Sequence, residues 1–142
     1  MSLNQFLLIL HILAVAYGMG IGMSNFLNMR IAKTQTGDIA KGLAMHRIGM
    51  MRYTDIAIAG ILLTGLLMVW AAGGVSAAPP WFHVKMAAVI VLVAAYGAMR
   101  MTVGQMLRTG NMALASRIAI LSPILSLAAI VSVICAVLAF KA

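Results

Sequence analysis

Residues 6–26 read FLLILHILAVAYGMGIGMSNF. This apolar run is long enough to cross a bilayer, whose hydrocarbon core of roughly 30 Å takes about 20 residues of helix. The imidazole of His11 lies well inside it. A polar ring in hydrocarbon needs a partner, and ionisable residues within membrane spans usually belong to functional sites. The run therefore predicts both a transmembrane helix and a candidate site around His11.

The composition indicates that the whole chain lies in a membrane. Of its 142 residues, 64% are hydrophobic and 8% are charged, and the mean hydropathy is +1.09. Soluble domains carry about 25% charged residues, so this chain has too few to cover a surface in water. Its apolar runs are too long and continuous for the alternating strands of a barrel. We expect a single integral membrane domain over residues 1–142.

Turn and cap residues divide the chain into four predicted helices. Thr36 and Gly37 form a turn signal, and Asp38 is placed to cap the next helix by accepting a first-turn amide. AAGGVSAAPP, residues 71–80, breaks helix on both sides with paired glycines and prolines. The predicted helices cover about residues 3–29, 39–71, 80–107 and 113–140. The expected fold is all-α, a four-helix transmembrane bundle.

The basic residues predict how the bundle is oriented. They cluster at two of the three joints between helices, as Arg30, Lys33, Lys41, Arg47 and Arg52 around the first and Arg100, Arg108 and Arg117 around the third. By the positive-inside rule these joints face the cytoplasm, so both chain termini face outward (N-out and C-out). Trp70 and Trp81 flank the second turn, where an interfacial aromatic belt is expected. We expect a multi-pass protein of a bacterial-type inner membrane.

The net charge of +8, from ten Lys and Arg against two Asp, follows from the same clustering. In a soluble protein it would suggest a nucleic-acid partner. Here the charges mark membrane joints, so no nucleic acid is expected. The expected partner is the lipid bilayer, with a homo-oligomer or a larger membrane complex as further possibilities. The only cysteine, Cys135, cannot form a disulfide within the chain and is expected to be a small buried residue.

Two interpretations of the helix face around His11 are open. At about 100° per residue, His11 shares this face with Ala14, Gly18, Gly22 and Asn25. Gly18 and Gly22 form a GxxxG motif, which lets another helix backbone approach closely and indicates a packing seam. The glycines also leave room for a planar macrocycle whose iron would be ligated by His11. The two interpretations are compatible, because a seam can end in a pocket.

His83 and Lys85 open the third predicted helix. His83 is either an interfacial ring or a second iron ligand, within reach of the same iron as His11 if the first and third helices are neighbours. Lys85 is rotated by about 200° from His83 around the helix, so the two side chains cannot both point into one tight site. Lys85 either extends its amine to the interface or binds the carboxylates of a substrate or of haem.

The sequence lacks the residues that other classes of catalytic or binding site need. The sequence contains no carboxylate pair within a membrane span, no Ser-His-Asp set, no CxxC motif and no phosphate-binding loop. Its 13 methionines are spread over most of the helices, which is typical of core filler rather than a copper path. Arg52 and Asp55 are three residues apart and are expected to pair on one helix face.

Two segments carry a resemblance to a known family. LLILHILAVAYGMG, residues 7–20, and PPWFHVKMAAVIVLVAAYG, residues 79–97, together resemble the HemJ-type protoporphyrinogen oxidases and the related CopD-like membrane proteins. Those proteins have a histidine in the first helix, matched by His11. They also have a W-x-H-x-K element at the start of the third helix, matched by Trp81, His83 and Lys85.

The chain departs from the family pattern in its first helix. Tyr17 stands where the family tends to have tryptophan, and Asn25 and Phe26 stand where it tends to have Pro-Arg. The resemblance spans about the first two thirds of the chain and implies a four-helix membrane oxidoreductase.

Under this resemblance the cofactor is haem b, with His11 as its axial ligand, and Lys85 interacts with carboxylates of the substrate or cofactor. From the residues themselves, His83 is added as a second candidate iron ligand, and Gly18 and Gly22 complete the candidate cofactor-binding set. The implied role is electron transfer or the oxidation of a porphyrinogen-like substrate. The alternative is a non-catalytic accessory subunit of a larger membrane complex, which the small-residue seams and the lack of a catalytic set also suit.

Overall fold

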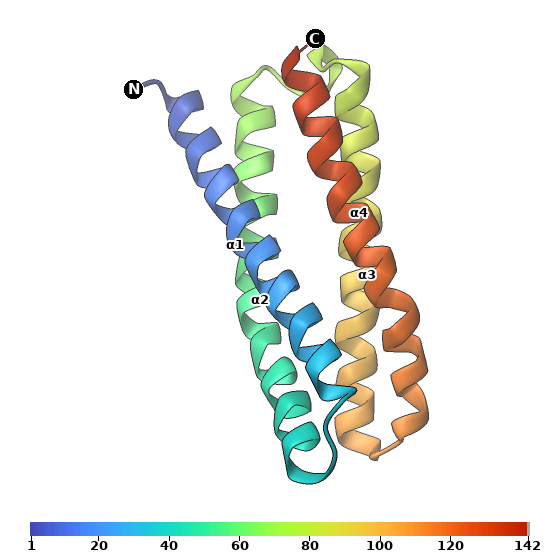
Figure 1. Cartoon of the computed structure of the whole chain (residues 1–142). Helices are drawn as coiled ribbons and strands as arrows, with labels where there is room; N and C mark the ends of the chain where they lie inside the picture. The colour runs from blue at the N-terminus through green and yellow to red at the C-terminus, as the bar shows by residue number, and fades with distance from the viewer. Residues whose placement is uncertain (142) are drawn as a thin grey trace. The chain divides into compact units, whose positions relative to one another are not determined.

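The computed structural model of the chain (Figure 1) describes residues 1–141, apart from the side chains of residues 77, 112, 119 and 139–141. It contains four α-helices, α1 (Leu3–Ala32), α2 (Gly37–Ala71), α3 (Pro80–Thr109) and α4 (Ala115–Lys141). Short 3-10 turns at Val75–Ala77 and Met112–Leu114 precede α3 and α4. The all-α class and the four predicted helices are confirmed, with ends that differ by a few residues.

All four helices are long and apolar enough to cross a membrane. α1 and α3 each have 30 residues and α2 has 35. A hydrocarbon core needs about 20 residues of helix, so each of these three helices has turns to spare beyond the core. The protein is therefore a multi-pass membrane protein, as the composition predicts.

The chain divides into two compact units, Met1–Ser76 and Ala77–Ala142. The first unit is the antiparallel pair of α1 and α2, and the second is the antiparallel pair of α3 and α4 (Figure 1). The packing of each pair can be derived from its own residues. The prediction that residues 1–142 form one domain stays a prediction.

In the first unit, α1 and α2 meet along a seam of small residues. On α1 the inward positions are Leu7, His11, Ala14, Gly18 and Ile21, with spacings of four and three residues that average the 3.5-residue repeat of left-handed helix pairs. We call these residues and the α2 residues they contact the α1–α2 seam.

Two glycines bring the backbones of the seam close together. A Cβ added at Gly18 would lie 3.4 Å from the Cβ of Ala57, and a Cβ added at Gly60 would lie 3.5 Å from the Cβ of Ala14. Small residues at such crossings let two membrane helices gain van der Waals contact along their length. The seam is therefore held mainly by close backbone approach.

The start of each helix in this unit is set locally. Ser2 caps α1 with a capping box, in which its hydroxyl accepts from the Gln5 amide at 3.2 Å and its own amide donates to Gln5 Oε1 at 3.0 Å. The prediction that Asp38 caps the second helix is wrong. α2 begins one residue earlier, at Gly37, whose φ of +63° suits glycine. Asp38 lies in the first turn, where its carboxylate complements the helix dipole.

The second unit repeats this kind of packing. Ala88, Ala95 and Thr102 are buried along α3, again spaced by seven residues, and Ala128 and Cys135 are buried on α4. The expectation of a buried thiol at Cys135 is confirmed. Small residues at these positions allow close approach of α3 and α4. Gly110 caps the C-terminus of α3 in the left-handed conformation, with φ +66°.

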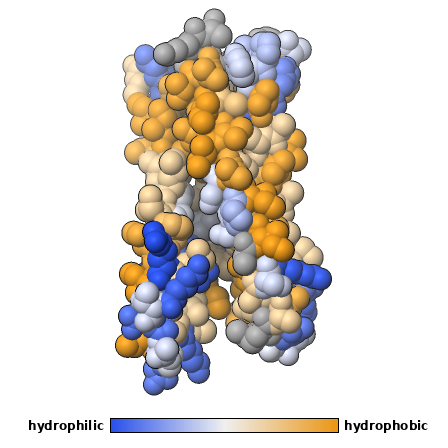
Figure 2. Space-filling view, turned by 45° about the vertical axis from the view of Figure 1, so that its right-hand side comes forward, coloured by the Kyte–Doolittle hydropathy of each residue, from blue (hydrophilic) through white to orange (hydrophobic). Residues whose placement is uncertain are grey.

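Most of the outward surface of both helix pairs is apolar. Figure 2 shows hydrophobic side chains over much of the face in view and hydrophilic side chains gathered toward the ends of the helices. In water such surface would drive aggregation. In a bilayer, lipid chains solvate it and the polar ends lie among headgroups.

The seam generates a direct test of its packing. We expect Gly18→Leu to lower the stability of the protein by about 1–3 kcal/mol, because a Cβ there already reaches contact with Ala57 at 3.4 Å and the further carbons of leucine would press the two helices apart. Gly22→Leu is the matched control one turn away, since a Cβ there meets nothing within 4 Å. Thermal unfolding of both variants in the same detergent, followed by circular dichroism, measures the difference. Equal stability of the two variants would contradict the seam.

Candidate functional site

His11 is held by a buried hydrogen bond from α1 to α2. Its side chain is 9% exposed, and its Nδ1 lies 2.8 Å from Oγ1 of Thr64. The Thr64 hydroxyl also lies 2.6 Å from the carbonyl oxygen of Gly60. Residues 53 positions apart in sequence are thus joined in the interior of the helix pair.

The geometry of these bonds favours a proton on Nδ1 of the ring. A backbone carbonyl can only accept, so the single hydroxyl proton of Thr64 is donated to Gly60. The hydroxyl oxygen then accepts from Nδ1–H of His11. In the neutral tautomer with its proton on Nδ1, an imidazole carries its lone pair on Nε2. Of the two neutral tautomers, the Thr64–Gly60 arrangement therefore favours this one.

The backbone of α2 completes the support of the ring. A Cβ added at Gly65 would lie 3.5 Å from Cε1 and 3.9 Å from Nδ1 of His11. Glycine at this position lets the imidazole pack close to the α2 backbone while Thr64 holds its nitrogen. Thr64 and Gly65 were not identified from the sequence. Their signal is that Thr64 carries the only hydroxyl in the apolar stretch 56–71.

The two glycines of the GxxxG motif have different surroundings. Gly18 contacts Ala57 and Ile61 across the seam, whereas Gly22 is exposed and meets nothing within 4 Å. The predicted seam through both glycines is therefore wrong at Gly22. The reason is the 3.5-residue repeat of packed helices, which after Gly18 places Ile21 inward. A cofactor role for either glycine stays a prediction.

His83 and Lys85 belong to the second unit, on α3. His83 is exposed and its ring meets that of Phe82 edge-on, with centroids 6.1 Å apart. Lys85 is half-buried and lies three residues before the buried Ala88, in the register of the residues that face α4. The two side chains thus occupy different faces of α3, as their rotation predicts. The two-histidine site stays a prediction.

Among the described residues, no three His, Cys, Asp or Glu side chains come together as a metal-binding group. Structural zinc sites need such a group. Haem differs, because the porphyrin supplies four nitrogens and the protein needs to provide only one or two axial ligands. A single histidine such as His11 can therefore serve as an axial ligand of haem.

The expected pair of Arg52 with Asp55 stays a prediction. Arg52 is exposed and lines a groove of about 680 Å³ between α1 and α2. Tyr17 and Ile21 line it from α1, and His46, Gly49 and Tyr53 are among its α2 residues.

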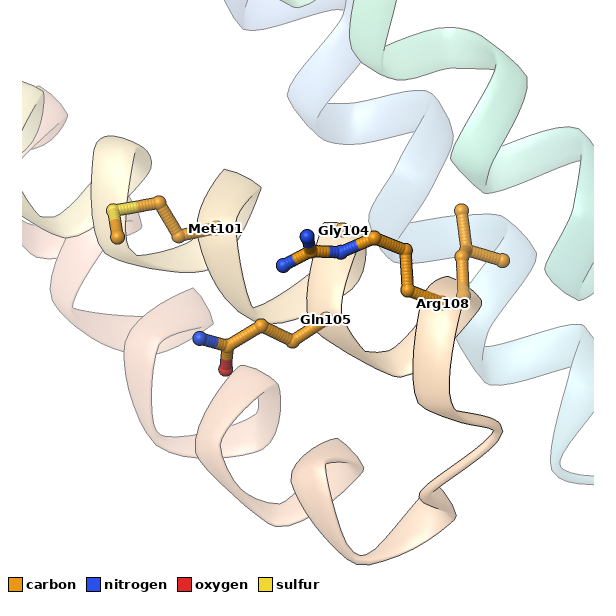
Figure 3. A pocket seen from close by; sticks show the side chains of 5 residues that line it. Met101, Gly104, Gln105 and Arg108 are labelled. Atoms are coloured by element: carbon orange, nitrogen blue, oxygen red, sulfur yellow. The ribbon is translucent and has the colours of Figure 1, made fainter.

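A second groove, of about 460 Å³, is lined by residues of α3 that include Met101, Gln105 and Arg108. Figure 3 shows that the labelled side chains all come from this one helix, so the groove is an open surface feature. Neither groove is lined by His11, His83 or Lys85.

Comparisons with known proteins give no family for this chain. No protein-family model matches it, and no match is found among curated proteins or solved structures. The resemblance to the HemJ-type and CopD-like proteins therefore rests on the residues quoted above and stays a prediction.

Replacing Thr64 by valine tests the buried hydrogen bond. Thr64→Val keeps the side-chain shape but leaves Nδ1–H of His11 without this acceptor, so we expect a loss of about 1–2 kcal/mol of stability. Thr102→Val is the matched control, because Thr102 is equally buried and donates to the Ala98 carbonyl at 2.7 Å. Thermal unfolding of both variants in the same detergent measures the difference. A loss of stability in Thr64→Val no larger than that in Thr102→Val would contradict the His11–Thr64 bond.

Proposed function

We propose that this protein is a membrane-embedded haem b protein with a redox role, and that His11 is an axial ligand of the iron. The observation that carries the proposal is the hydrogen bond of His11 Nδ1 with Thr64 Oγ1. In the neutral tautomer that this bond favours, the lone pair is on Nε2, and a neutral imidazole nitrogen is what haem iron takes from a histidine ligand.

The surroundings of His11 fit this role. Iron-ligating histidines usually donate their other ring N–H to a neighbouring acceptor, which orients the ring and makes the ligating nitrogen more basic. Thr64 occupies that position for His11, and its own proton is held by the Gly60 carbonyl. Gly65 lets the ring pack close to α2. A haem bound here would supply one-electron redox chemistry.

Under the proposal, three further expectations describe the assembled protein. It resides in a bacterial-type inner membrane with both termini outside. Lys85 provides a positive charge for the carboxylates of the haem or of a porphyrinogen-like substrate. His83 is the candidate second axial ligand, within reach of the same iron as His11 if α1 and α3 are neighbours.

A non-catalytic accessory subunit is the second candidate function. The same hydrogen bond favours it, because Thr64 supplies a partner for the imidazole without any cofactor. Polar side chains of this kind hold membrane helices together across many non-catalytic seams. The two functions differ in whether the purified protein carries a chromophore that depends on His11.

A visible absorption spectrum distinguishes the two candidates. We expect detergent-purified protein, made with an adequate haem supply, to show a Soret band and sharp α and β bands after reduction with dithionite. His11→Ala should lose these bands, because iron loses its axial ligand. Thr64→Val should keep haem but shift its reduction potential, since the hydrogen bond that tunes the ligand is gone.

The control is His46→Ala, because His46 is exposed at the other end of the helix pair. It should leave the spectrum unchanged. A featureless spectrum from folded wild-type protein would contradict haem binding and favour the accessory subunit. An unchanged spectrum of His11→Ala would exclude His11 as the ligand.

The proposed orientation is testable by labelling single cysteines. Cys135 is the only native cysteine, so a Cys135→Ala background carries either Ser2→Cys at the N-terminus or Gln35→Cys in the first joint. We expect a membrane-impermeant maleimide applied to intact cells to label Ser2→Cys alone, and Gln35→Cys only after lysis. The reverse pattern would overturn the N-out orientation.

A further inference from the structure

The groove between α1 and α2 lies at the depth of lipid headgroups. Trp70 is 76% exposed near the end of α2 and belongs at a membrane interface. Counting back about 20 residues, the length of one span, reaches Met50, which lines the groove. α2 begins further on, at Gly37. The groove therefore lies at the second interface, where α2 leaves the hydrocarbon.

Part of the lining of this groove is polar and part is apolar. Arg52, His46 and Tyr53 contribute a guanidinium, an imidazole and a phenol, whereas Ile21 and Met50 contribute apolar wall. Gly49 leaves the groove open, because a Cβ there would meet nothing within 4 Å. An occupant that uses the whole groove must itself combine an anionic group with hydrocarbon.

The groove carries positive charge on its polar part. Arg52 is exposed and lines the groove, and the basic residues nearest along the helix are Lys41 and Arg47. A guanidinium binds phosphate oxygens through two parallel N–H donors. The phenols of Tyr17 and Tyr53, 45% and 49% exposed, can donate to further phosphate or ester oxygens.

We propose that this groove is a binding site for one anionic phospholipid of the bilayer. Arg52 and His46 hold its phosphate headgroup, and the start of an acyl chain lies along Ile21 and Met50. The volume of about 680 Å³ suits a headgroup with its glycerol and the first acyl carbons. A free phosphate ion would leave the apolar wall unused. The site lies apart from His11 and does not depend on haem.

Native mass spectrometry of the whole protein tests the proposal. The detergent-purified protein is titrated with phosphatidylglycerol or, separately, with phosphatidylcholine of the same chain length. We expect one phosphatidylglycerol to bind at least tenfold more tightly than phosphatidylcholine. Gly49→Leu, which fills the groove, and Arg52→Gln, which removes the guanidinium, should each weaken that first site by at least about tenfold.

Two matched variants and one competitor make the result specific. Gly42→Leu adds the same side chain to an equally open glycine of α2, and Lys41→Gln removes one charge from an exposed position. Both should bind like wild type, with circular dichroism confirming the fold of all variants. Wild-type affinity in Gly49→Leu, or equal binding of the two lipids, would overturn the site. Displacement of the lipid by millimolar inorganic phosphate would show a phosphate site rather than a lipid site.

Discussion

An imidazole buried between two membrane helices must find its hydrogen-bond partner within the protein, because hydrocarbon offers none. In this chain the partner of His11 is the Thr64 hydroxyl, which itself donates to Gly60. This chain of two bonds favours one neutral tautomer of the ring and sets the register of α1 against α2. A one-residue slip of either helix would turn the partner about 100° away. The candidate site therefore depends on this interaction.

The small-residue seam makes that interaction possible. Ala14 against Gly60 and Gly18 against Ala57 bring the backbones together, and only at such a separation can a threonine hydroxyl reach an imidazole across the pair. Gly65 continues this seam beside the ring. Packing and chemistry thus share one helix face. At the other end of the same pair the residues change from small and apolar to basic and aromatic, as the membrane gives way to headgroups.

Apolar length, turn residues and charge placement were enough to predict four helices, their approximate ends and His11 as a buried polar group. What they missed depends on how two helices meet. The residue type of Asp38 predicts a cap, but Gly37 begins the helix. Gly22 was placed with Gly18 by the 3.6-residue period of a lone helix, whereas packed helices follow 3.5 residues. Thr64 was missed because a partner 53 positions away leaves no local pattern.

The central claim is that Thr64 holds the proton of His11 on Nδ1. ¹⁵N NMR of protein labelled only at histidine tests it most directly, because protonated and unprotonated ring nitrogens resonate far apart. The chain has three histidines, and the signals of His11 are those that vanish in His11→Gln. The account predicts a protonated Nδ1 and an unprotonated or metal-bound Nε2. A proton on Nε2 with Nδ1 unprotonated would contradict it.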